Sequence, residues 1–369
     1  MTKLRVAVVG AGHLGKIHAR LLQTQTDAQL VAVADPSSTA QQQITEQLGA
    51  PTVSDYRELF GTIDAAIVAT PTRMHFEITK ELLGQKIHTL IEKPMTDSVS
   101  DAEELVHLAN RHQCVVSVGH VERFNPAIKS ALELVGTPKF IQASRMSGFT
   151  FRSTDIGVVH DLMIHDIDLV NSIFPGKLIE TRALGMSVFG SNEDMAQARL
   201  QFDCGGVANL SASRCSYQAE RSFQVFGTDG FANVNLTQST VTFVKIPGWV
   251  KNRQYDLLDT TAQQQAVIRE ELFNKILPKS EIEVPKSNAI LSEQKNWITA
   301  IRDGEPCQVT AQQGKEAVEI AQSVIDSLAA HRWSKLEPQS TGPFGMIDST
   351  PKKILPFRSK DASEQSKAA

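Results

Sequence analysis

The sequence predicts an α/β protein with an N-terminal doubly wound parallel sheet and a C-terminal α+β domain whose open sheet is largely antiparallel. Short apolar strands alternate with helices over roughly the first 120 residues, which indicates parallel strands buried on both faces. Farther along, strand-like runs follow one another closely, joined by the hairpin turns Asp203-Cys204-Gly205-Gly206 and Thr228-Asp229-Gly230. We therefore expect domains at 1–121 and 122–338, followed by a polar, flexible tail at 339–369.

In the first domain, an apolar strand at Leu4–Val9 leads into a helix at about His13–Gln25. Ser100 and Glu103 have the spacing of a capping box, which predicts a helix over Asp101–His112. Further strands are expected at Leu30–Ala34, Ile63–Ala69, His88–Ile91 and Cys114–Gly119.

In the second domain, a long helix is expected over Val158–Phe174, and Pro175-Gly176 is expected to end it. Other helices are expected at Pro126–Leu134, Leu291–Arg302 and Gly314–His331, and strands at Lys139–Ser147, Thr181–Val188, Ala196–Phe202, Val207–Ser213, Ser222–Phe226 and Phe231–Asn235. Residues 246–290 have no clear pattern, and we expect them to be irregular.

Composition narrows the functional classes. The net charge of −4 without blocks of one sign argues against a nucleic-acid partner. The four cysteines are widely spaced, which indicates reduced, mostly buried thiols and a cytoplasmic protein. No secretory signal is visible at the N-terminus, and no apolar run reaches the roughly 18 residues of a membrane helix.

The run Gly10-Ala11-Gly12-His13-Leu14-Gly15 has the G-x-G-x-x-G pattern of a Rossmann dinucleotide site. The first glycine permits a tight turn, the second lets the backbone approach a pyrophosphate, and the third lets helix and strand pack closely. Asp35 ends the next strand, where a carboxylate bonds the ribose 2′-hydroxyl and repels a 2′-phosphate. The alternative for Asp35 is a turn cap before Pro36. We expect NAD, with NADP less favoured.

Glu92-Lys93-Pro94 follows a predicted strand at its carboxyl end, where open α/β sheets bind ligands. Lys93 would then lie near the nicotinamide. The alternative is a surface lysine in a loop, which is the commoner fate of this residue.

Asp161, His165 and Asp168 share one face of the long predicted helix. A histidine beside carboxylates can act as a general base near neutral pH. The alternatives are ordinary capping and pairing, or a metal site. We expect no metal, because no cysteine or further histidine cluster supports one. His160 points away from His165 and is expected to be structural.

Together these residues carry a resemblance. The chain resembles the Gfo/Idh/MocA oxidoreductase family in the stretches Gly10–Ala19, Ala69–His75, Glu92–Pro94, Val118–Pro126 and in Asp161 with His165. One departure is a single glycine, Gly157, where family members often have a pair.

The resemblance implies roles for these residues. Lys93 would bond the reacting oxygen, His165 would be the acid/base, and Asp161 would bind substrate and tune His165. Thr70, Pro71 and His75 would line the nicotinamide side, and Arg123 and Asn125 would reach substrate. The expected site consists of these residues together with the residues of the glycine turn, Asp35 and Glu92. The family's open sheet often forms the interface of a homodimer or homotetramer.

Two segments, Gly119–Pro126 and Asp161–Asp168, resemble a subgroup that includes UDP-N-acetylglucosamine 3-dehydrogenases. A nucleotide sugar carries a diphosphate, for which Arg145 and Arg152 are candidates; surface or paired arginines are the alternative. The sequence thus predicts an NAD-dependent dehydrogenase acting on a sugar or nucleotide-sugar hydroxyl. An inositol or free-sugar dehydrogenase and a non-catalytic NAD-binding sensor remain as alternatives, and a metal-dependent lyase or hydrolase is more remote.

Overall fold

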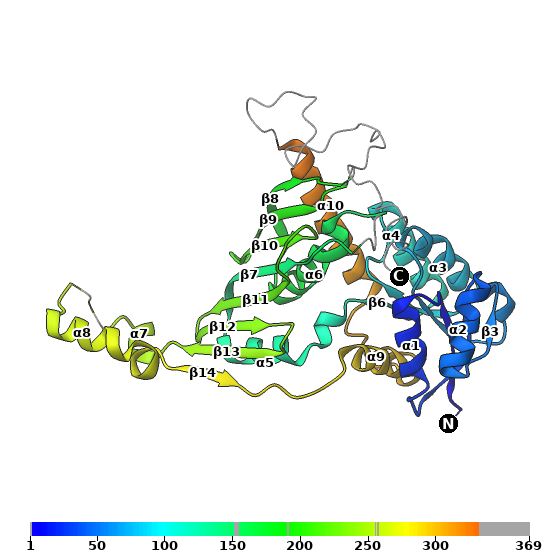
Figure 1. The fold of residues 1–369 in the computed structure, drawn as a ribbon, viewed down its shortest axis with the longest axis horizontal. Coiled ribbons are helices and arrows are strands. Elements are labelled where there is room, and N and C mark those ends of the chain that lie inside the picture. The colour runs from blue at the N-terminus through cyan, green and yellow to red at the C-terminus, as the bar shows by residue number, and fades with distance from the viewer. Residues whose placement is uncertain (1, 151–154, 190–191, 255, 257, 332–369) are drawn as a thin grey trace, which may run out of the picture.

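The computed structural model describes residues 2–150, 155–189, 192–254, 256 and 258–331, and these form two β-sheets with flanking helices (Figure 1). Arg152 and the expected tail at 339–369 lie outside the described residues.

The first sheet has six parallel strands in the order β3-β2-β1-β4-β5-β6, which confirms the predicted doubly wound sheet. Its order reverses between β1 and β4, so a crevice is expected at the carboxyl ends of those two strands. The strands are β1 (Leu4–Val9), β2 (Ala28–Ala34), β3 (Thr52–Val53), β4 (Ala65–Val68), β5 (His88–Glu92) and β6 (Val116–Gly119).

Both faces of this sheet are buried, because residues alternate between two cores along each strand. Val6 and Val8 pack in one core and Ala7 and Val9 in the other. Helices α1 (His13–Leu22), α2 (Ser38–Leu48) and α9 (Ala289–Asp303) cover the first face, and α3 (His75–Gly84) and α4 (Val99–His112) cover the second. Fully buried Trp297 brings α9 onto this sheet from far along the chain.

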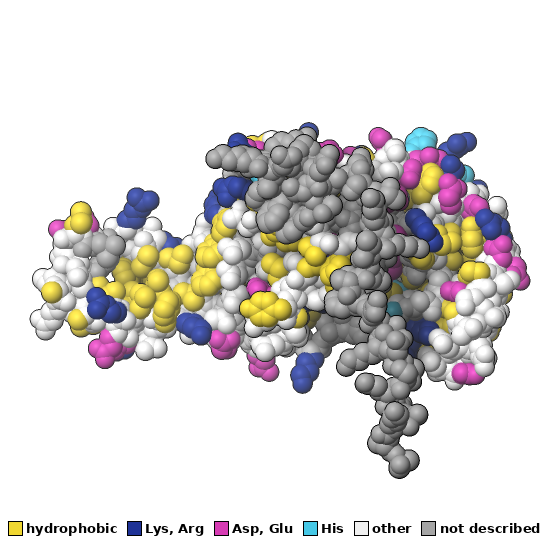
Figure 2. Space-filling view, turned by 45° about the horizontal axis from the view of Figure 1, so that its top comes forward, with side chains coloured by type: hydrophobic (Ala, Val, Ile, Leu, Met, Phe, Trp, Pro, Cys, Tyr) yellow, Lys and Arg dark blue, Asp and Glu magenta, His cyan; other side chains and the backbone are white. Residues whose placement is uncertain are grey.

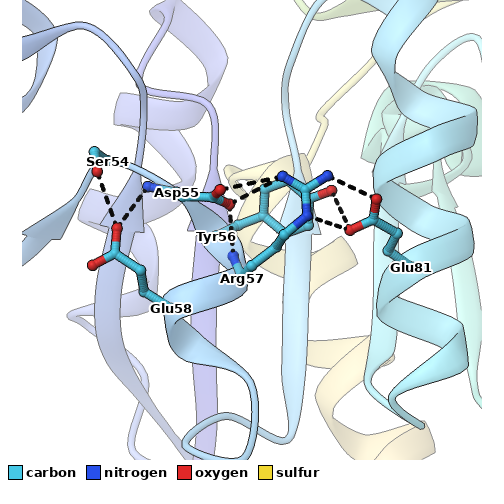
Figure 3. Close-up of polar contacts among 6 residues, drawn as sticks. All are labelled: Ser54, Asp55, Tyr56, Arg57, Glu58 and Glu81. Carbon is cyan, nitrogen blue, oxygen red and sulfur yellow. Dashed lines mark hydrogen bonds and ion pairs between the residues drawn. The ribbon is translucent and has the colours of Figure 1, made fainter.

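A surface network links the 3₁₀ helix η1 (Tyr56–Leu59) to α3 (Figure 3). Arg57 donates two hydrogen bonds of 2.7 Å to the Glu81 carboxylate, which also accepts a 2.9 Å bond from the Tyr56 hydroxyl. Asp55 caps η1 by accepting from the Arg57 backbone. This network fixes the segment that follows β3, although an exposed ion pair of this kind contributes little to stability.

The second sheet is mixed, as predicted, and has eight strands in the order β14-β13-β12-β11-β7-β10-β9-β8. Among the described strands of this second sheet, only β7 and β10 pair in parallel, and the other neighbours are antiparallel. The strands are β7 (Pro138–Met146), β8 (Leu178–Met186), β9 (Met195–Phe202), β10 (Val207–Ser213), β11 (Glu220–Gly227), β12 (Gly230–Asn235), β13 (Thr240–Lys245) and β14 (Lys279–Ile282). One face is covered by α5 (Pro126–Val135), α6 (Ile164–Ile173) and α10 (Ala311–Ala330), and α10 also contacts α4 beside the first sheet.

The other face of the second sheet carries an aromatic row in one register: Phe140, Phe226 and Phe231. Phe226 and Phe231 stack with ring centroids 4.8 Å apart, and Phe140 lies 5.5 Å from Phe226. Beyond the same end of the sheet, α7 (Gly248–Lys251), α8 (Ala262–Glu271) and the π-helical turn η5 (Leu272–Ile276) project as an arm (Figure 1). None of these three helical segments has a buried residue, and hydrophobic side chains gather along the arm in Figure 2.

Several local expectations are wrong. Ser98, not Ser100, caps α4, because its hydroxyl accepts from Asp101. The predicted helix over Val158–Phe174 begins instead with a π-helical turn, η4 (Val159–Met163). Residues 246–290 are not wholly irregular, since they contain α7, α8 and β14. All four cysteines are free, but none is buried.

No helix among the described residues combines the length and apolarity needed to cross a bilayer.

Candidate active site

The glycine turn has the backbone that a dinucleotide site needs. Gly10 has φ +100°, and a Cβ there would lie 2.6 Å from the Ala69 carbonyl oxygen. A Cβ on Gly15 would overlap the Gly10 carbonyl oxygen, so glycine permits the close packing of α1 on the turn. A Cβ on Gly12 would meet nothing within 4 Å, so the space above this residue is open.

The N-terminus of α1 and the Asp35 carboxylate lie together at this turn. Gly12 is the N-cap and provides no side-chain cap, so the first N–H groups of the helix, including those of His13 and Leu14, remain available to an anion. The Asp35 carboxylate accepts from the backbone of Ala11 at 2.8 Å and of Ser37 at 2.9 Å. These residues fit the pyrophosphate and adenosine ribose of NAD.

His75 joins the loops that follow β4 and β5. Its two ring nitrogens lie 2.9 Å from the carbonyl oxygens of Thr70 and Pro94. Burial lowers the pKa of His75, so the ring is neutral and donates to one of the two. The imidazole is thus occupied by backbone, while Pro71 is exposed beside it. Contact of His75 with the nicotinamide stays a prediction.

Glu92, at the end of β5, is held from the opposite side of the sheet. It bonds His18 of α1 at 2.7 Å, and the other ring nitrogen of His18 lies 2.9 Å from the Gln294 amide of α9. Burial is the largest single influence and opposes the charged form, but the His18 hydrogen bond together with the electrostatic attraction of His18 and Lys93 outweighs it and lowers the pKa of Glu92. This buried chain fixes the residue directly before Lys93.

The structure brings Lys93 and Asp161 together from sequence positions 68 residues apart. The Lys93 ammonium donates to the Asp161 carbonyl oxygen at 2.5 Å, and its nitrogen lies 3.4 Å from Asp161 Oδ1. Asp161 lies in the π-helical turn η4, a geometry that is often found at functional sites. Glu193 holds this turn by accepting from the Val159 backbone at 3.0 Å.

Three imidazoles lie in the electrostatic range of Lys93: His120, His160 and His165. Burial, followed by the positive charges of Lys93 and Arg145, holds the pKa of His165 well below its usual 6.5. His165 Nδ1, His160 Nε2 and both ring nitrogens of His120 are buried without a hydrogen-bond partner among the described residues. Such groups are uncommon in a closed core and are consistent with a ligand site.

Sequence reasoning did not single out His120 as a site residue. It follows β6 directly, at the sheet edge where Glu92 ends β5, and its position after the strand was the available signal. His160, expected to be structural, is also buried near Lys93.

The other residues that were predicted to bind substrate form hydrogen bonds or ion pairs with groups of the protein itself. Arg123 forms two bonds to Asp168, at 2.7 and 2.9 Å. Asn125 caps α5 by accepting from the Ala127 backbone at 3.0 Å. Arg145 pairs with two carboxylates. Substrate contacts by these three residues stay predictions.

Comparison with known proteins agrees with this geometry. Residues 4–120 match the model of the oxidoreductase family, NAD-binding Rossmann fold, and residues 148–336 match that of the oxidoreductase family, C-terminal alpha/beta domain; both are Gfo/Idh/MocA models. The chain belongs to the Gfo/Idh/MocA oxidoreductases. The predicted resemblance and the NAD-binding domain are thereby confirmed.

Several named relatives are dehydrogenases, and one relative, of Mediterraneibacter gnavus, is a 2,7-anhydro-N-acetylneuraminate hydratase. UDP-N-acetylglucosamine 3-dehydrogenase of Acidithiobacillus ferrooxidans is 32% identical over 266 residues, which cover 70% of this chain and 84% of the relative. Its solved structure superposes with a TM-score of 0.77 over 89% of this chain and 98% of that chain. Myo-inositol 2-dehydrogenase of Thermotoga maritima is 26% identical over 357 residues, covering 90% of this chain and 99% of the relative.

Proposed function

We propose that this oxidoreductase is an NAD-dependent dehydrogenase of a secondary hydroxyl on a nucleotide sugar, with the 3-hydroxyl of UDP-N-acetylglucosamine as the first candidate. The observation that carries the proposal is the Lys93–Asp161 contact, because it joins a cation at the cofactor edge of the first sheet to the turn that precedes His165. A fixed ammonium and a neutral imidazole in one site are the groups that alcohol oxidation needs.

Bound NAD supplies a hydride acceptor, and the protein aligns it with the substrate. The residues that would hold NAD are the glycine turn, the N-terminus of α1 and Asp35. The Asp35 carboxylate favours a free ribose 2′-hydroxyl and opposes a 2′-phosphate, which supports NAD over NADP. Thr70, Pro71 and Lys93 follow β4 and β5 at the same sheet edge and would border the nicotinamide.

Proton transfer falls to His165. Because its pKa is lowered, the imidazole is neutral at pH 7 and can accept the hydroxyl proton. Lys93 has a further N–H beyond those directed at Asp161, and this N–H would bond the substrate oxygen as negative charge develops there. Asp161 holds the ammonium in place through its backbone carbonyl.

The choice of substrate rests on relatedness. A UDP-N-acetylglucosamine 3-dehydrogenase shares 32% identity with this chain, whereas a myo-inositol 2-dehydrogenase shares 26% over a longer alignment. An inositol or free sugar is therefore the second candidate. A non-catalytic sensor is less well supported, since it does not require a lysine near a half-buried, neutral histidine.

A substrate panel tests the proposal. Purified protein with NAD would be mixed with UDP-N-acetylglucosamine, N-acetylglucosamine, glucose and myo-inositol, and NADH followed by its absorbance. The proposal predicts turnover fastest on the nucleotide sugar. Turnover of myo-inositol alone would support the second candidate, and NAD binding without turnover on any of them would support a sensor.

We also propose that the protein works in the cytoplasm as a homodimer or homotetramer associated through the open face of its second sheet. Four free cysteines suit a reducing compartment. The aromatic row of Phe140, Phe226 and Phe231 on that face, together with the uncovered arm, supports the association.

A further inference from the structure

Two arginines lie opposite each other on the helix-covered face of the second sheet. In the β7–β11 pair, Arg145 is directly opposite Arg221. The neighbouring inward positions on β11, Phe223 and Val225, are fully buried, and the two-residue period of a strand directs Arg221 to the same face. Directly opposite residues of an antiparallel pair have Cβ atoms about 5 Å apart.

Arg145 is buried, at 3% exposure, and has an unused donor. Its Nε lies 2.9 Å from both oxygens of Asp166, and its Nη1 lies 2.9 Å from Glu122 Oε1. Its Nη2 is buried and has no hydrogen-bond partner among the described residues. A buried guanidinium N–H left unpaired is costly, so this atom is suited to a ligand.

Arg221 is exposed, and its side chain makes no hydrogen bond or ion pair with any other described residue. Glu122 and Asp166 already offset the charge of Arg145, so what remains for an anion is the pair of unused N–H donors on Arg145 Nη2 and Arg221. The two arginines also lie near the chemistry. The charges of both contribute to the lowered pKa of His165, and Asp166, which pairs with Arg145, is the next residue.

We propose that Arg145 Nη2 and Arg221 form an anion subsite that binds the diphosphate of a nucleotide-sugar substrate. This inference rests on the proposed nucleotide-sugar function. A diphosphate is attached at C1 of the sugar, close to a reacting C3, so a cationic pair beside the base is suitably placed. Glu122 and Asp166 also face the subsite, and their two negative charges balance the charges of Arg145 and Arg221. The subsite would therefore bind an anion through the directed N–H groups of Arg145 Nη2 and Arg221 rather than through a net positive charge.

The sequence pattern of β11 indicated that Arg221 lies on the inward face. Along Arg221-Ser222-Phe223-Gln224-Val225, every second residue is inward, and an arginine at an inward position is unusual in a core strand. Sequence reasoning singled out Arg145 but did not single out Arg221, because the strand was expected to start one residue later.

Calorimetric titration with UDP, in the presence of NAD, tests the subsite without turnover. We expect Arg221→Gln to weaken UDP binding about tenfold or more and Arg221→Lys to weaken it less, with NAD binding unchanged in both. Arg182→Gln removes an equivalent charge from an 80% exposed side chain on β8 and should leave UDP binding unchanged. Uridine, which lacks phosphate, should bind weakly and equally to all variants.

Equal UDP affinity in wild type and Arg221→Gln, or no UDP binding by wild type, would overturn the subsite. Failure of the proposed reaction is separable, because Arg221-dependent UDP binding without turnover of any nucleotide sugar would refute the reaction and leave the subsite standing. Arg221 is used because it is exposed, whereas replacing Arg145 would leave Glu122 and Asp166 buried without their partner.

Discussion

At the scale of single residues, the proposed mechanism depends on Lys93, which follows β5, and His165, which lies in α6. Replacing Lys93 by Met, or His165 by Asn, removes oxygen stabilisation or proton transfer, and we expect turnover to fall about 10²–10⁴-fold. NAD affinity, measured by fluorescence titration, should stay within a few fold of wild type because the glycine turn is untouched. Full turnover in both variants would remove these roles.

The lowered pKa of His165 leads to a second prediction, which concerns the pH dependence of the reaction. A base with a lowered pKa stays neutral as pH falls and becomes protonated only below that pKa. The acid limb of kcat/KM should therefore lie below pH 6.5, the ordinary value for histidine. Steady-state rates between pH 5 and 9 would check this. An acid limb at or above the ordinary value would contradict a half-buried imidazole whose pKa is lowered by desolvation and by the charge of Lys93.

In the proposed cofactor site, we expect the choice between NAD and NADP to depend on the Asp35 carboxylate. Asp35→Asn keeps the size of the side chain but removes the charge that opposes a 2′-phosphate. We expect NAD affinity to fall, by up to about 1.5–3 kcal/mol as for a hydrogen bond to a charged group, and the ratio of NADP to NAD affinity to rise. Titration with both cofactors gives the ratio. An unchanged ratio would show that Asp35 does not set the preference.

At the scale of elements, the π-helical turn η4 positions Asp161 and leads into His165. Glu193→Ala would leave the Val159 N–H without its acceptor, costing about 1–3 kcal/mol in free energy of unfolding. We expect kcat to fall as well, because the turn that holds Lys93 shifts. Urea unfolding and steady-state rates measure the two effects.

Glu193→Gln is the matched control for that substitution. Its amide oxygen can still accept from Val159, and since burial already raises the pKa of Glu193, losing the charge should matter little. Near-wild-type values are expected for this variant. If Glu193→Ala were equally active and stable, η4 would not depend on this contact.

Strong periodic signals made most elements predictable. The apolar run of β1 and the glycine turn predicted the strand, the helix and the cofactor site without tertiary information. Long-range contacts were not predictable from local patterns. Glu193 binds the Val159 N–H at the start of the π-helical turn from 34 residues along the chain, and Trp297 of α9 is buried against the first sheet. Contacts between residues this far apart leave no local sequence pattern from which they could be predicted.

The same difference between local and long-range signals applies to the residues of the proposed site. The position of Lys93 after a strand indicated the sheet edge, whereas its contact with Asp161 depends on how the domains pack. Sequence also cannot distinguish an arginine that is paired from one that is available. Arg123 is neutralised by Asp168, whereas Arg221 has no such partner among the described residues.

At the scale of the whole molecule, the open sheet face predicts self-association. Gln224 lies on that face, opposite Asn233 and Gln142 of the adjacent strands. Gln224→Arg places a charge in the proposed interface, and in a two-fold assembly the same charge occurs on both copies. We expect association to weaken about tenfold or more in sedimentation velocity.

Gln85→Arg makes the same change at an exposed position at the end of α3 and should leave the association unchanged. A wild-type monomer at micromolar concentration, or equal association of both variants with wild type, would contradict an interface at this face.

Transfer of the sugar hydrogen is the most direct test of the central claim. UDP-N-acetylglucosamine carrying deuterium at C3 would be incubated with the protein and NAD, and the reduced cofactor examined by mass spectrometry. We predict NADH that contains the deuterium, with transfer slowed about 10²–10⁴-fold in the Lys93→Met and His165→Asn variants. Turnover of this substrate that leaves the deuterium on the sugar, or transfer at the wild-type rate in both variants, would contradict this mechanism.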